Sequence, residues 1–209
     1  MSKDDSNLHN NSLKDEMNKE LIYDKWAHTY EDYVTNLEYK GPKNLSNELY
    51  DYIDLNKIAN PTILDFGCGT GLLGIEIHNK FANKLFNLDG IDISEEMIRI
   101  CKSKNIYNNI WKKNLFNESM ENTDFYDVIV SCGVFLEGHV SFKMINILLN
   151  YTKQSGIIIF TLRESFKEKN ISEYIEHVSL NPRLEIQHEC YLEYLPNIKC
   201  KMILAKKIY

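Results

Sequence analysis

Short apolar runs alternate with amphipathic segments through most of the chain. Between these runs, apolar residues recur three and four positions apart, which is the spacing of one helix face. Alternating buried strands and amphipathic helices predict a parallel, doubly wound α/β sheet. The runs expected to form its strands are 63–66, 85–91, 110–112, 126–132 and 157–160.

The carboxyl end of the chain departs from this alternation. After a last helical segment that ends near residue 178, residues 184–194 and 198–207 form two long runs of strand-like sequence. A short turn sequence that contains Pro196 separates them. We therefore expect a terminal hairpin.

The amino end carries a stripe of aromatic residues. Trp26, Tyr30, Tyr33 and Leu37 recur at i, i+4, i+7 and i+11, and Tyr23 precedes Trp26 by one turn. This spacing predicts a helix from about residue 13 to 37 with one aromatic face. The face docks the helix on the domain, or it forms a lid over a ligand with Tyr23, Trp26 and Tyr30 at the substrate pocket. The two interpretations are compatible, because a lid must also bury its apolar face.

The 209 residues suit one domain with a full core. Residues 1–12 are rich in Ser, Asn and Asp, and we expect a disordered tail there. Residues 13–60 are expected to form N-terminal helices on the substrate side. Residues 61–209 are expected to form the cofactor-binding core.

The first candidate site is a glycine-rich turn. The strand at 63–66 runs into Gly67, Gly69 and Gly71 at alternate positions, and a helix follows. Glycines let the backbone approach a ligand closely, and the helix presents free N–H groups at its start. Asp65 precedes the first glycine by two residues. An acid there would repel a pyrophosphate, but it suits an ammonium group, directly or through water.

A second acid follows at the end of the next strand. Asp92, 21 residues after Gly71, is placed to accept hydrogen bonds from both hydroxyls of a ribose. Asn114 and Leu115 follow the third strand, where a side-chain amide and a backbone N–H would read an adenine edge. A ligand with a ribose, an amino group and no phosphate suggests S-adenosylmethionine rather than a nicotinamide dinucleotide. A glycine turn that only packs helix on strand would leave Asp65 and Asp92 unexplained.

Composition narrows the class of protein. The net charge of −6 argues against an electrostatic nucleic-acid binder, although it does not bear on a small or locally basic nucleic-acid substrate. No apolar run reaches ~18 residues and the amino terminus is polar, so we expect neither a membrane span nor a secretory signal. Histidines and cysteines show no metal spacing, and an odd number of cysteines favours free thiols in the cytoplasm. The cysteines are Cys68, Cys101, Cys132, Cys190 and Cys200.

The order of these motifs resembles that of class I S-adenosylmethionine-dependent methyltransferases. The resemblance runs from 63–71 through 90–94 to 126–129 and covers roughly residues 20–209. Residues 23–30 and 133–140 are further similar to the Williams–Beuren syndrome chromosome-region methyltransferase family (methyltransferase-like protein 27), as is the stretch 160–164. The resemblance implies a seven-stranded, mostly parallel sheet in the order 3-2-1-4-5-7-6, with the last strand antiparallel and an N-terminal helical lid.

The resemblance also implies roles for individual residues. The glycine loop would hold the methionyl end, Asp92 the ribose, and Ile93, Asn114 and Leu115 the adenine. Many of these enzymes have Asp where this chain has Asn114, but an amide oxygen still accepts a hydrogen bond. Cys132 would lie beside the sulfonium, as a contact or simply as a small buried residue. The implied cofactor contacts are Asp65, Gly67, Cys68, Gly69, Gly71, Asp92, Ile93, Asn114, Leu115 and Cys132.

Methyl transfer needs little acid–base chemistry. It is an in-line displacement on a sulfonium with a neutral leaving group, so alignment supplies much of the acceleration. A base is needed only if the acceptor must first lose a proton. His139 and Tyr39 are the candidate catalytic residues at the pocket mouth, with Glu137 as a third. For His139 and Glu137, the alternative is a solvated loop that caps the next helix.

The function expected from the sequence is methyl transfer from S-adenosylmethionine to an unidentified small-molecule acceptor, with S-adenosylhomocysteine as product. We expect a monomer or weak homodimer with no metal and no membrane partner. A small-molecule partner is favoured over a nucleic acid, and a protein or RNA acceptor stays open as an alternative. A second hypothesis is a catalytically silent cofactor-binding module that serves as a subunit or sensor. It stays open because the chain has no recognisable acceptor motif such as Asn-Pro-Pro-Tyr.

Overall fold

The strands of this structure, which is a computed structural model, form one seven-stranded sheet. They are β1 (Thr62–Phe66), β2 (Asn87–Asp92), β3 (Asn109–Lys112), β4 (Tyr126–Phe135), β5 (Thr152–Arg163), β6 (Leu184–Leu195) and β7 (Ile198–Lys207). The structure describes residues 3–12, 18–121, 123–135, 140–141, 143–163 and 168–209. Within these residues the strand order is β3-β2-β1-β4-β5-β7-β6. β7 runs antiparallel to β5 and β6, and the other pairs are parallel, so the expected fold class and strand order are confirmed.

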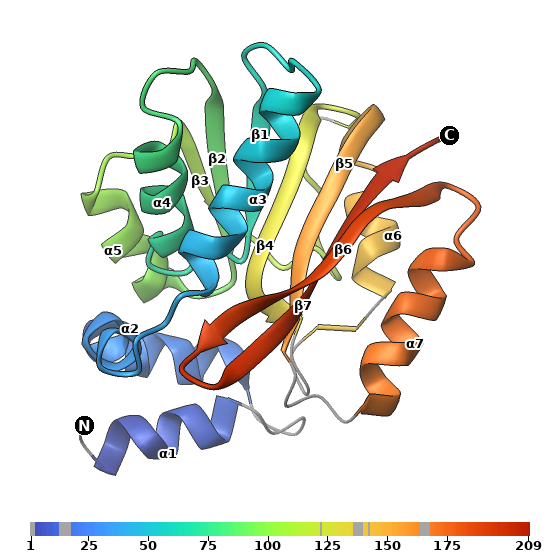
Figure 1. Cartoon of the computed structure of the whole chain (residues 1–209). Coiled ribbons are helices and arrows are strands. Elements are labelled where there is room, and N and C mark those ends of the chain that lie inside the picture. Colours follow the sequence, from blue (N-terminus) through green and yellow to red (C-terminus); the bar gives the residue numbers. More distant parts are fainter. Residues whose placement is uncertain (1–2, 13–17, 122, 136–139, 142, 164–167) are drawn as a thin grey trace.

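Helices cover both faces of this sheet (Figure 1). Side chains alternate between the two faces along each strand. Ile63 and Val128 therefore enter the core beneath α3 and α4, while Leu64 and Ile129 enter the core beneath α6 and α7. The helices are α1 (Lys3–Ser12), α2 (Lys19–Asn36), α3 (Gly41–Leu55), α4 (Leu72–Lys80), α5 (Glu95–Ser103), α6 (Lys143–Leu148) and α7 (Glu168–Ser179).

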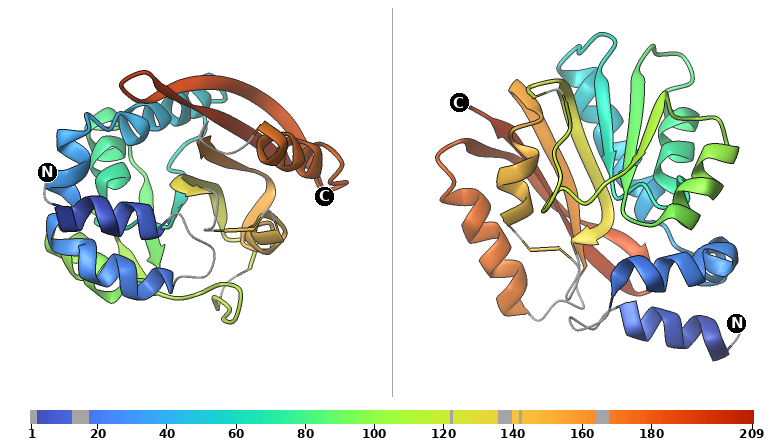
Figure 2. Two further views of the ribbon diagram at one scale, coloured as in Figure 1. Left: turned by 90° about the horizontal axis from the view of Figure 1, so that it is seen from below. Right: turned by 180° about the vertical axis from the view of Figure 1, so that it is seen from behind.

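Helices α1 and α2 lie across the end of the sheet (Figures 1 and 2). This is the end at which β1, β2 and β4 finish, where ligands bind in doubly wound sheets. The side chain of Asn18 caps α2 by accepting a hydrogen bond from Leu21 N at 3.2 Å. The helix expected over 13–37 is thus described from Lys19 to Asn36, and residues 13–17 lie outside the described part.

The expectation of a disordered tail at residues 1–12 was wrong for residues 3–12, which form α1. Two polar side chains of this segment, His9 and Asp5, bind α2. The His9 ring stacks 5.8 Å from that of Trp26, and His9 Nδ1 lies 2.6 Å from the hydroxyl of Tyr33. Asp5 Oδ1 accepts a hydrogen bond from Thr29 Oγ1 at 2.5 Å.

Strand β4 continues past the glycine expected to end it. Gly133 has φ +75, and the β4–β5 register shifts between Ser131 and Phe135. Such a bulge bends a strand and re-aims its side chains. The N–H of Gly133 leaves the regular ladder and donates to Thr161 Oγ1 at 3.0 Å. The bulge brings Cys132 and Gly133 to the cavity at the sheet end.

Candidate active site

The glycine loop requires its glycines for different physical reasons. Gly67, Gly69 and Gly71 have φ of 77, 52 and 92, the left-handed region that other residues adopt at a cost. A Cβ on Gly67 would lie 2.2 Å from Val134 Cγ2, and one on Gly71 would lie 2.9 Å from Cys101 Sγ. A Cβ on Gly69 would meet nothing within 4 Å. Gly69 therefore faces open space, where a ligand would rest on bare backbone.

Asp92 joins this loop to the helix that follows β2. Its Oδ2 accepts a hydrogen bond from Gly69 N and its Oδ1 accepts one from Ser94 N, each at 2.9 Å. A carboxylate has about four lone-pair sites, so both oxygens retain a site for a ribose hydroxyl. Burial raises the pKa of Asp92 above its ordinary value, while the backbone hydrogen bonds oppose that shift.

A cavity of about 140 Å³ opens beside Asp92. It brings together five of the expected cofactor contacts: Gly67, Gly69, Asp92, Ile93 and Cys132. Tyr23 and Tyr30 of α2 line it as well. The remaining lining residues, which were not expected from the sequence, are Lys19, Phe66, Ile91, Met97, Lys113, Gly133, Val134 and Val140.

We expect an adenosyl group to bind in this cavity. Ile93 and Met97 supply apolar surface for a base next to the free acceptor sites of Asp92. Gly69 leaves the space for the rest of the ligand. The backbone and side chains therefore suit a nucleoside whose ribose binds Asp92.

Asp65 lies in β1, two residues before the first glycine of the loop. It lines a second cavity of about 50 Å³, together with Cys68, Gly69 and Cys132. Tyr107 donates a hydrogen bond to Asp65 Oδ2 at 2.7 Å. Burial raises the pKa of Asp65 to about 7, although the Tyr107 hydrogen bond lowers it. One carboxylate oxygen is thus held by the protein, and the group is suited to pair with a ligand ammonium.

Three expected contacts, Asn114, Leu115 and Gly71, line neither of these two cavities. The side-chain oxygen of Asn114 accepts a hydrogen bond from Phe116 N at 3.1 Å, and Leu115 is buried in the core beside α6 and α7. Gly71 forms the left-handed amino cap of α4. Lys113 and Met97 line the cavity instead. Both follow a strand end, as the expected residues do, but no motif singled them out.

A third cavity, of about 60 Å³, lies between α1, α2 and the ends of β4, β5 and β6. Tyr30 lines all three cavities, and Tyr39 and Cys132 each line two. The Tyr39 hydroxyl lies 3.3 Å from Cys132 Sγ and donates to the Tyr194 hydroxyl at 3.1 Å. The third cavity is lined by His9, Ser12, Tyr23, Trp26, Tyr30, Tyr33, Val34, Leu37, Tyr39, Gly133, Arg163, Tyr194 and Leu195.

The groups at this junction keep their protons at neutral pH. Burial raises the pKa of Tyr30 and Tyr39 well above the ordinary phenol value, and it raises that of Cys132 to about 12. Tyr39 is therefore suited to donate a hydrogen bond rather than to take a proton. Cys132 is a buried contact residue and is unsuited to act as a nucleophile. The other candidates, His139 and Glu137, lie outside the described residues.

Helix α2 is held in place by polar contacts as well as by its aromatic face. Asp24 Oδ1 accepts hydrogen bonds from Ser94 Oγ at 2.6 Å and from Glu96 N at 3.2 Å, which ties α2 to the start of α5. Glu20 pairs with Lys112 at 2.8 Å. Trp26 and Tyr33 are buried against the domain. These contacts support the docking interpretation, and movement of α2 as a lid stays a prediction.

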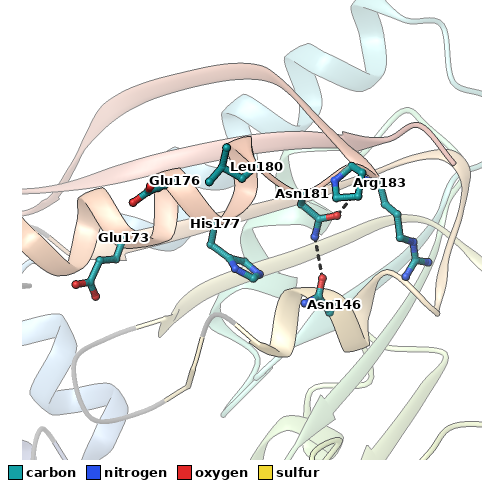
Figure 3. A pocket seen from close by; sticks show the side chains of 8 residues that line it. Asn146, Glu173, Glu176, His177, Leu180, Asn181 and Arg183 are labelled. Carbon is teal, nitrogen blue, oxygen red and sulfur yellow. Dashed lines mark hydrogen bonds between the residues drawn. The ribbon is translucent and has the colours of Figure 1, made fainter.

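Two further features lie apart from this junction. A surface hollow of about 640 Å³ lies between α6 and α7 at the opposite end of the sheet, where β6 begins (Figure 3). Glu48, His188 and Cys190 have ligand atoms within 4.8 Å of one another, the only such group among the described residues, but they line none of the three cavities. No described helix is both long enough and apolar enough to cross a membrane.

Comparison with known sequences identifies relatives of this chain. Residues 63–156 match the family model of a methyltransferase domain. A malonyl-[acyl-carrier protein] O-methyltransferase of Ilyobacter polytropus is 29% identical over 205 residues, which are 88% of this chain and 70% of the relative. Methyltransferase-like protein 27 of Homo sapiens is 26% identical over 156 residues, which are 74% of this chain and 62% of the relative. The chain therefore spans less than two thirds of the human protein.

Solved structures show the same fold. The plantazolicin methyltransferase BpumL with bound S-adenosylhomocysteine has a TM-score of 0.68 at 16% identity, covering 99% of this chain and 100% of that one. The magnesium protoporphyrin IX methyltransferase of Synechocystis, also with S-adenosylhomocysteine, has a TM-score of 0.64 at 14% identity, covering 91% and 100%. The [4+2]-cyclase SpnF has a TM-score of 0.57 at 14% identity, covering 77% and 80%.

The sheet order, the glycine loop and the acid at the end of β2 are the features expected of an enzyme that uses a nucleoside methyl donor. Residues 63–156 form a methyltransferase domain, the fold is that of the class I S-adenosylmethionine-dependent methyltransferases, and the cofactor is S-adenosylmethionine.

Proposed function

We propose that this enzyme transfers the methyl group of S-adenosylmethionine to a small-molecule acceptor that binds in the third cavity. The observation that carries the proposal is the meeting of three cavities at Tyr30, Tyr39 and Cys132. The adenosyl group would occupy the first cavity and the methionyl group the second. The sulfonium between them would then face the third.

The chain's own residues would hold and align the two reactants. Asp92 and the bare backbone at Gly69 would bind the adenosyl group, and the ionised form of Asp65 would bind the ammonium. The hydroxyls of Tyr39 and Tyr194 would orient the acceptor by hydrogen bonds. The aromatic face of α2 would exclude water from the reacting atoms. The bound donor supplies an electrophilic methyl on a sulfonium, so alignment provides most of the acceleration.

The size of the third cavity supports a small acceptor or a small group at the end of a larger one. Relatives differ in what their names say they act on, from malonyl-[acyl-carrier protein] to magnesium protoporphyrin IX. The cyclase among the structural neighbours shows that this fold is compatible with other chemistry. The acceptor must therefore be found by experiment.

The test is incubation of the purified protein with methyl-labelled S-adenosylmethionine and fractions of a metabolite extract. We expect label in an acceptor and one S-adenosylhomocysteine per label, with both lost in Asp92→Asn. Asp51→Asn, an exposed acid on α3, is the matched control. Ligand binding without turnover in any fraction would contradict the proposal and support a sensor or subunit role.

His139 remains a sequence-based candidate for a general base. If the acceptor must lose a proton to His139, kcat will decrease as the pH is lowered below the pKa of that histidine. His139→Gln will then remove both this pH dependence and most of the rate. A pH–rate profile of both proteins, once an acceptor is found, decides this. A flat profile in both would exclude His139 as the base.

A further inference from the structure

A cation lines the third cavity at the end of β5. The guanidinium of Arg163 lies with Nη1 3.4 Å from His9 Nε2, and its Cζ is 5.8 Å from the centre of the Tyr194 ring. Its Nε is buried and has no hydrogen-bond partner among the described residues. No salt bridge joins Arg163 to any carboxylate in that part of the chain. Within the described part of the chain, this positive charge thus has no counter-charge.

The neighbours of Arg163 hold the guanidinium in place without neutralising it. Burial and the charge of Arg163 lower the pKa of His9, so this histidine is neutral. A neutral His9 accepts from Arg163 at Nε2, which leaves its Nδ1–H to donate to the Tyr33 hydroxyl at 2.6 Å. The face of the Tyr194 ring offers a weak cation–π contact. These are orienting contacts, and none supplies a negative charge.

The charge lies next to the expected path of the methyl group. The guanidinium of Arg163 lies over the face of the Tyr194 ring. The Tyr194 hydroxyl accepts a hydrogen bond from the Tyr39 hydroxyl, which also contacts Cys132 Sγ. Gly133 leaves space beside these two hydroxyls. A Cβ on Gly133 would lie 2.9 Å from the Tyr194 hydroxyl and 3.0 Å from the Tyr39 hydroxyl. A molecule held by Arg163 would therefore extend toward the junction with the cofactor cavities.

We propose that Arg163 is the anchor for a carboxylate group of the methyl acceptor, so that the substrates of this enzyme are small carboxylic acids or carry a terminal carboxylate. Leaving a half-buried guanidinium unpaired is unfavourable, and a ligand carboxylate relieves it with charge-assisted hydrogen bonds. One guanidinium balances one carboxylate, whereas a phosphate dianion would need a second cation. Among the residues that the structure describes, Arg163 is the only Lys or Arg that lines this cavity. This inference rests on the proposed function, because it assigns the third cavity to the acceptor.

The first test measures binding and does not depend on turnover. Acetate, benzoate and phenylacetate, with the matching neutral amides, are titrated into the protein saturated with S-adenosylhomocysteine. We expect at least one acid to bind, and Arg163→Gln to weaken it by about ten- to hundredfold, the loss expected for a charged hydrogen bond. The amides should bind both proteins alike. Arg163→Lys should retain part of the preference for the acid.

The controls separate loss of the anchor from loss of the fold. Arg183→Gln, far from the site beside the hollow of Figure 3, should bind the acids as the wild type does. Arg163→Gln should retain the wild-type affinity for S-adenosylhomocysteine and its unfolding midpoint. If Arg163→Gln does not fold, Arg163→Lys provides the test. The inference then requires that the preference of this variant for acid over amide is weaker than that of the wild type. Equal binding of acid and amide to the wild type, or acid binding that is indifferent to residue 163, would overturn the inference.

A second test uses the methyl-labelling assay of the proposed function. Carboxylates in the metabolite extract are converted to methylamides, which leaves phosphates and alcohols free. Loss of acceptor activity supports a carboxylate acceptor, and retained activity overturns it while the methyltransferase function stands. If no fraction accepts methyl even before treatment, the proposed function fails, and the binding titrations alone decide the role of Arg163.

Discussion

The hydroxyl of Tyr107 donates a hydrogen bond to Asp65 Oδ2 at 2.7 Å, and this contact joins the segment after α5 to the end of β1, just before the glycine loop. Glycines make room for the ring. A Cβ on Gly74 would lie 2.4 Å from the Tyr107 hydroxyl, and one on Gly90 would lie 3.1 Å from its Cδ1. Two glycines outside the loop thus make room for a partly buried tyrosine, which in turn orients the acid that lines the second cavity.

The first prediction concerns the pH dependence that Asp65 creates. Its pKa is about 7 in the folded protein against an ordinary 3.8, so the folded state binds more protons between these values. Its contribution to the free energy of unfolding is therefore complete below about pH 4 and is lost as the pH rises through about 7. A ligand ammonium favours the ionised acid, so affinity for S-adenosylhomocysteine should rise toward pH 7 with release of a proton. Calorimetry in buffers of different ionisation enthalpy measures this release.

Two variants test the assignment to Asp65. Asp65→Asn should bind the ligand more weakly and without this proton release. Tyr107→Phe keeps the ring in its glycine-lined space but removes the donor, so the pH at which affinity rises should shift upward and stability should fall by about 1–3 kcal/mol. Proton release that persists in Asp65→Asn would assign it to another group.

The second prediction concerns Asp92. Replacing it by Ala removes the acceptors for the ribose hydroxyls, and a lost charged hydrogen bond costs roughly 1.5–3 kcal/mol, so affinity for S-adenosylhomocysteine should fall about ten- to hundredfold. Asp92 also accepts from Gly69 N and Ser94 N, so a smaller loss of unfolding free energy should accompany it. Calorimetry and thermal unfolding measure the two effects. Normal binding by Asp92→Ala would refute the ribose contact.

The third prediction compares two glycines of one loop. Gly69→Ala places a methyl group in open space of the cofactor cavity, so ligand affinity should fall at least about tenfold, while the left-handed backbone costs ~1–2 kcal/mol of stability. Gly71→Ala instead drives its Cβ to 2.9 Å from Cys101 Sγ. It should lower the unfolding midpoint more than Gly69→Ala does. The opposite ranking of the two variants would mean that Gly69 does not face the cofactor.

The fourth prediction concerns α2. If α2 is a lid, amides from Asn18 to Tyr39 should exchange fast in the free protein and slowly with S-adenosylhomocysteine bound. Trp26→Ala should then weaken ligand retention and abolish turnover while the sheet stays protected. If α2 is a fixed part of the core, exchange is slow in both states, and Trp26→Ala destabilises the domain by about 3–5 kcal/mol. Equal, high protection with and without ligand would rule out the lid.

The hydrogen bonds that Asp24 accepts provide a second variant for the hydrogen-exchange experiment. Asp24→Ala removes the acceptor for Ser94 Oγ and Glu96 N, so it loosens α2 from α5 without touching the aromatic face. Exchange over α2 should then speed up in the ligand-bound state. Thr35→Ala, exposed near the end of the same helix, is the control.

The sequence by itself was enough to predict the alternation of strands and helices, the strand order through its family resemblance, and the placement of Gly67, Gly69, Asp92 and Ile93 at one site. These features are local. A strand, a glycine turn and a helix start are each encoded within a few neighbouring residues, and the topology of a parallel sheet brings all strand ends to one edge.

Contacts between distant segments were decided only by the tertiary structure. Tyr107 reaches Asp65 across 42 positions, and Arg163 reaches His9 across 154. Such pairs leave no periodicity in the chain, because a side chain's partner depends on how whole elements pack. The same reason explains α1, whose polar sequence suggested disorder until the aromatic face of α2 offered it partners. It also explains why Lys113 and Met97, rather than Asn114 and Leu115, line the adenosyl cavity.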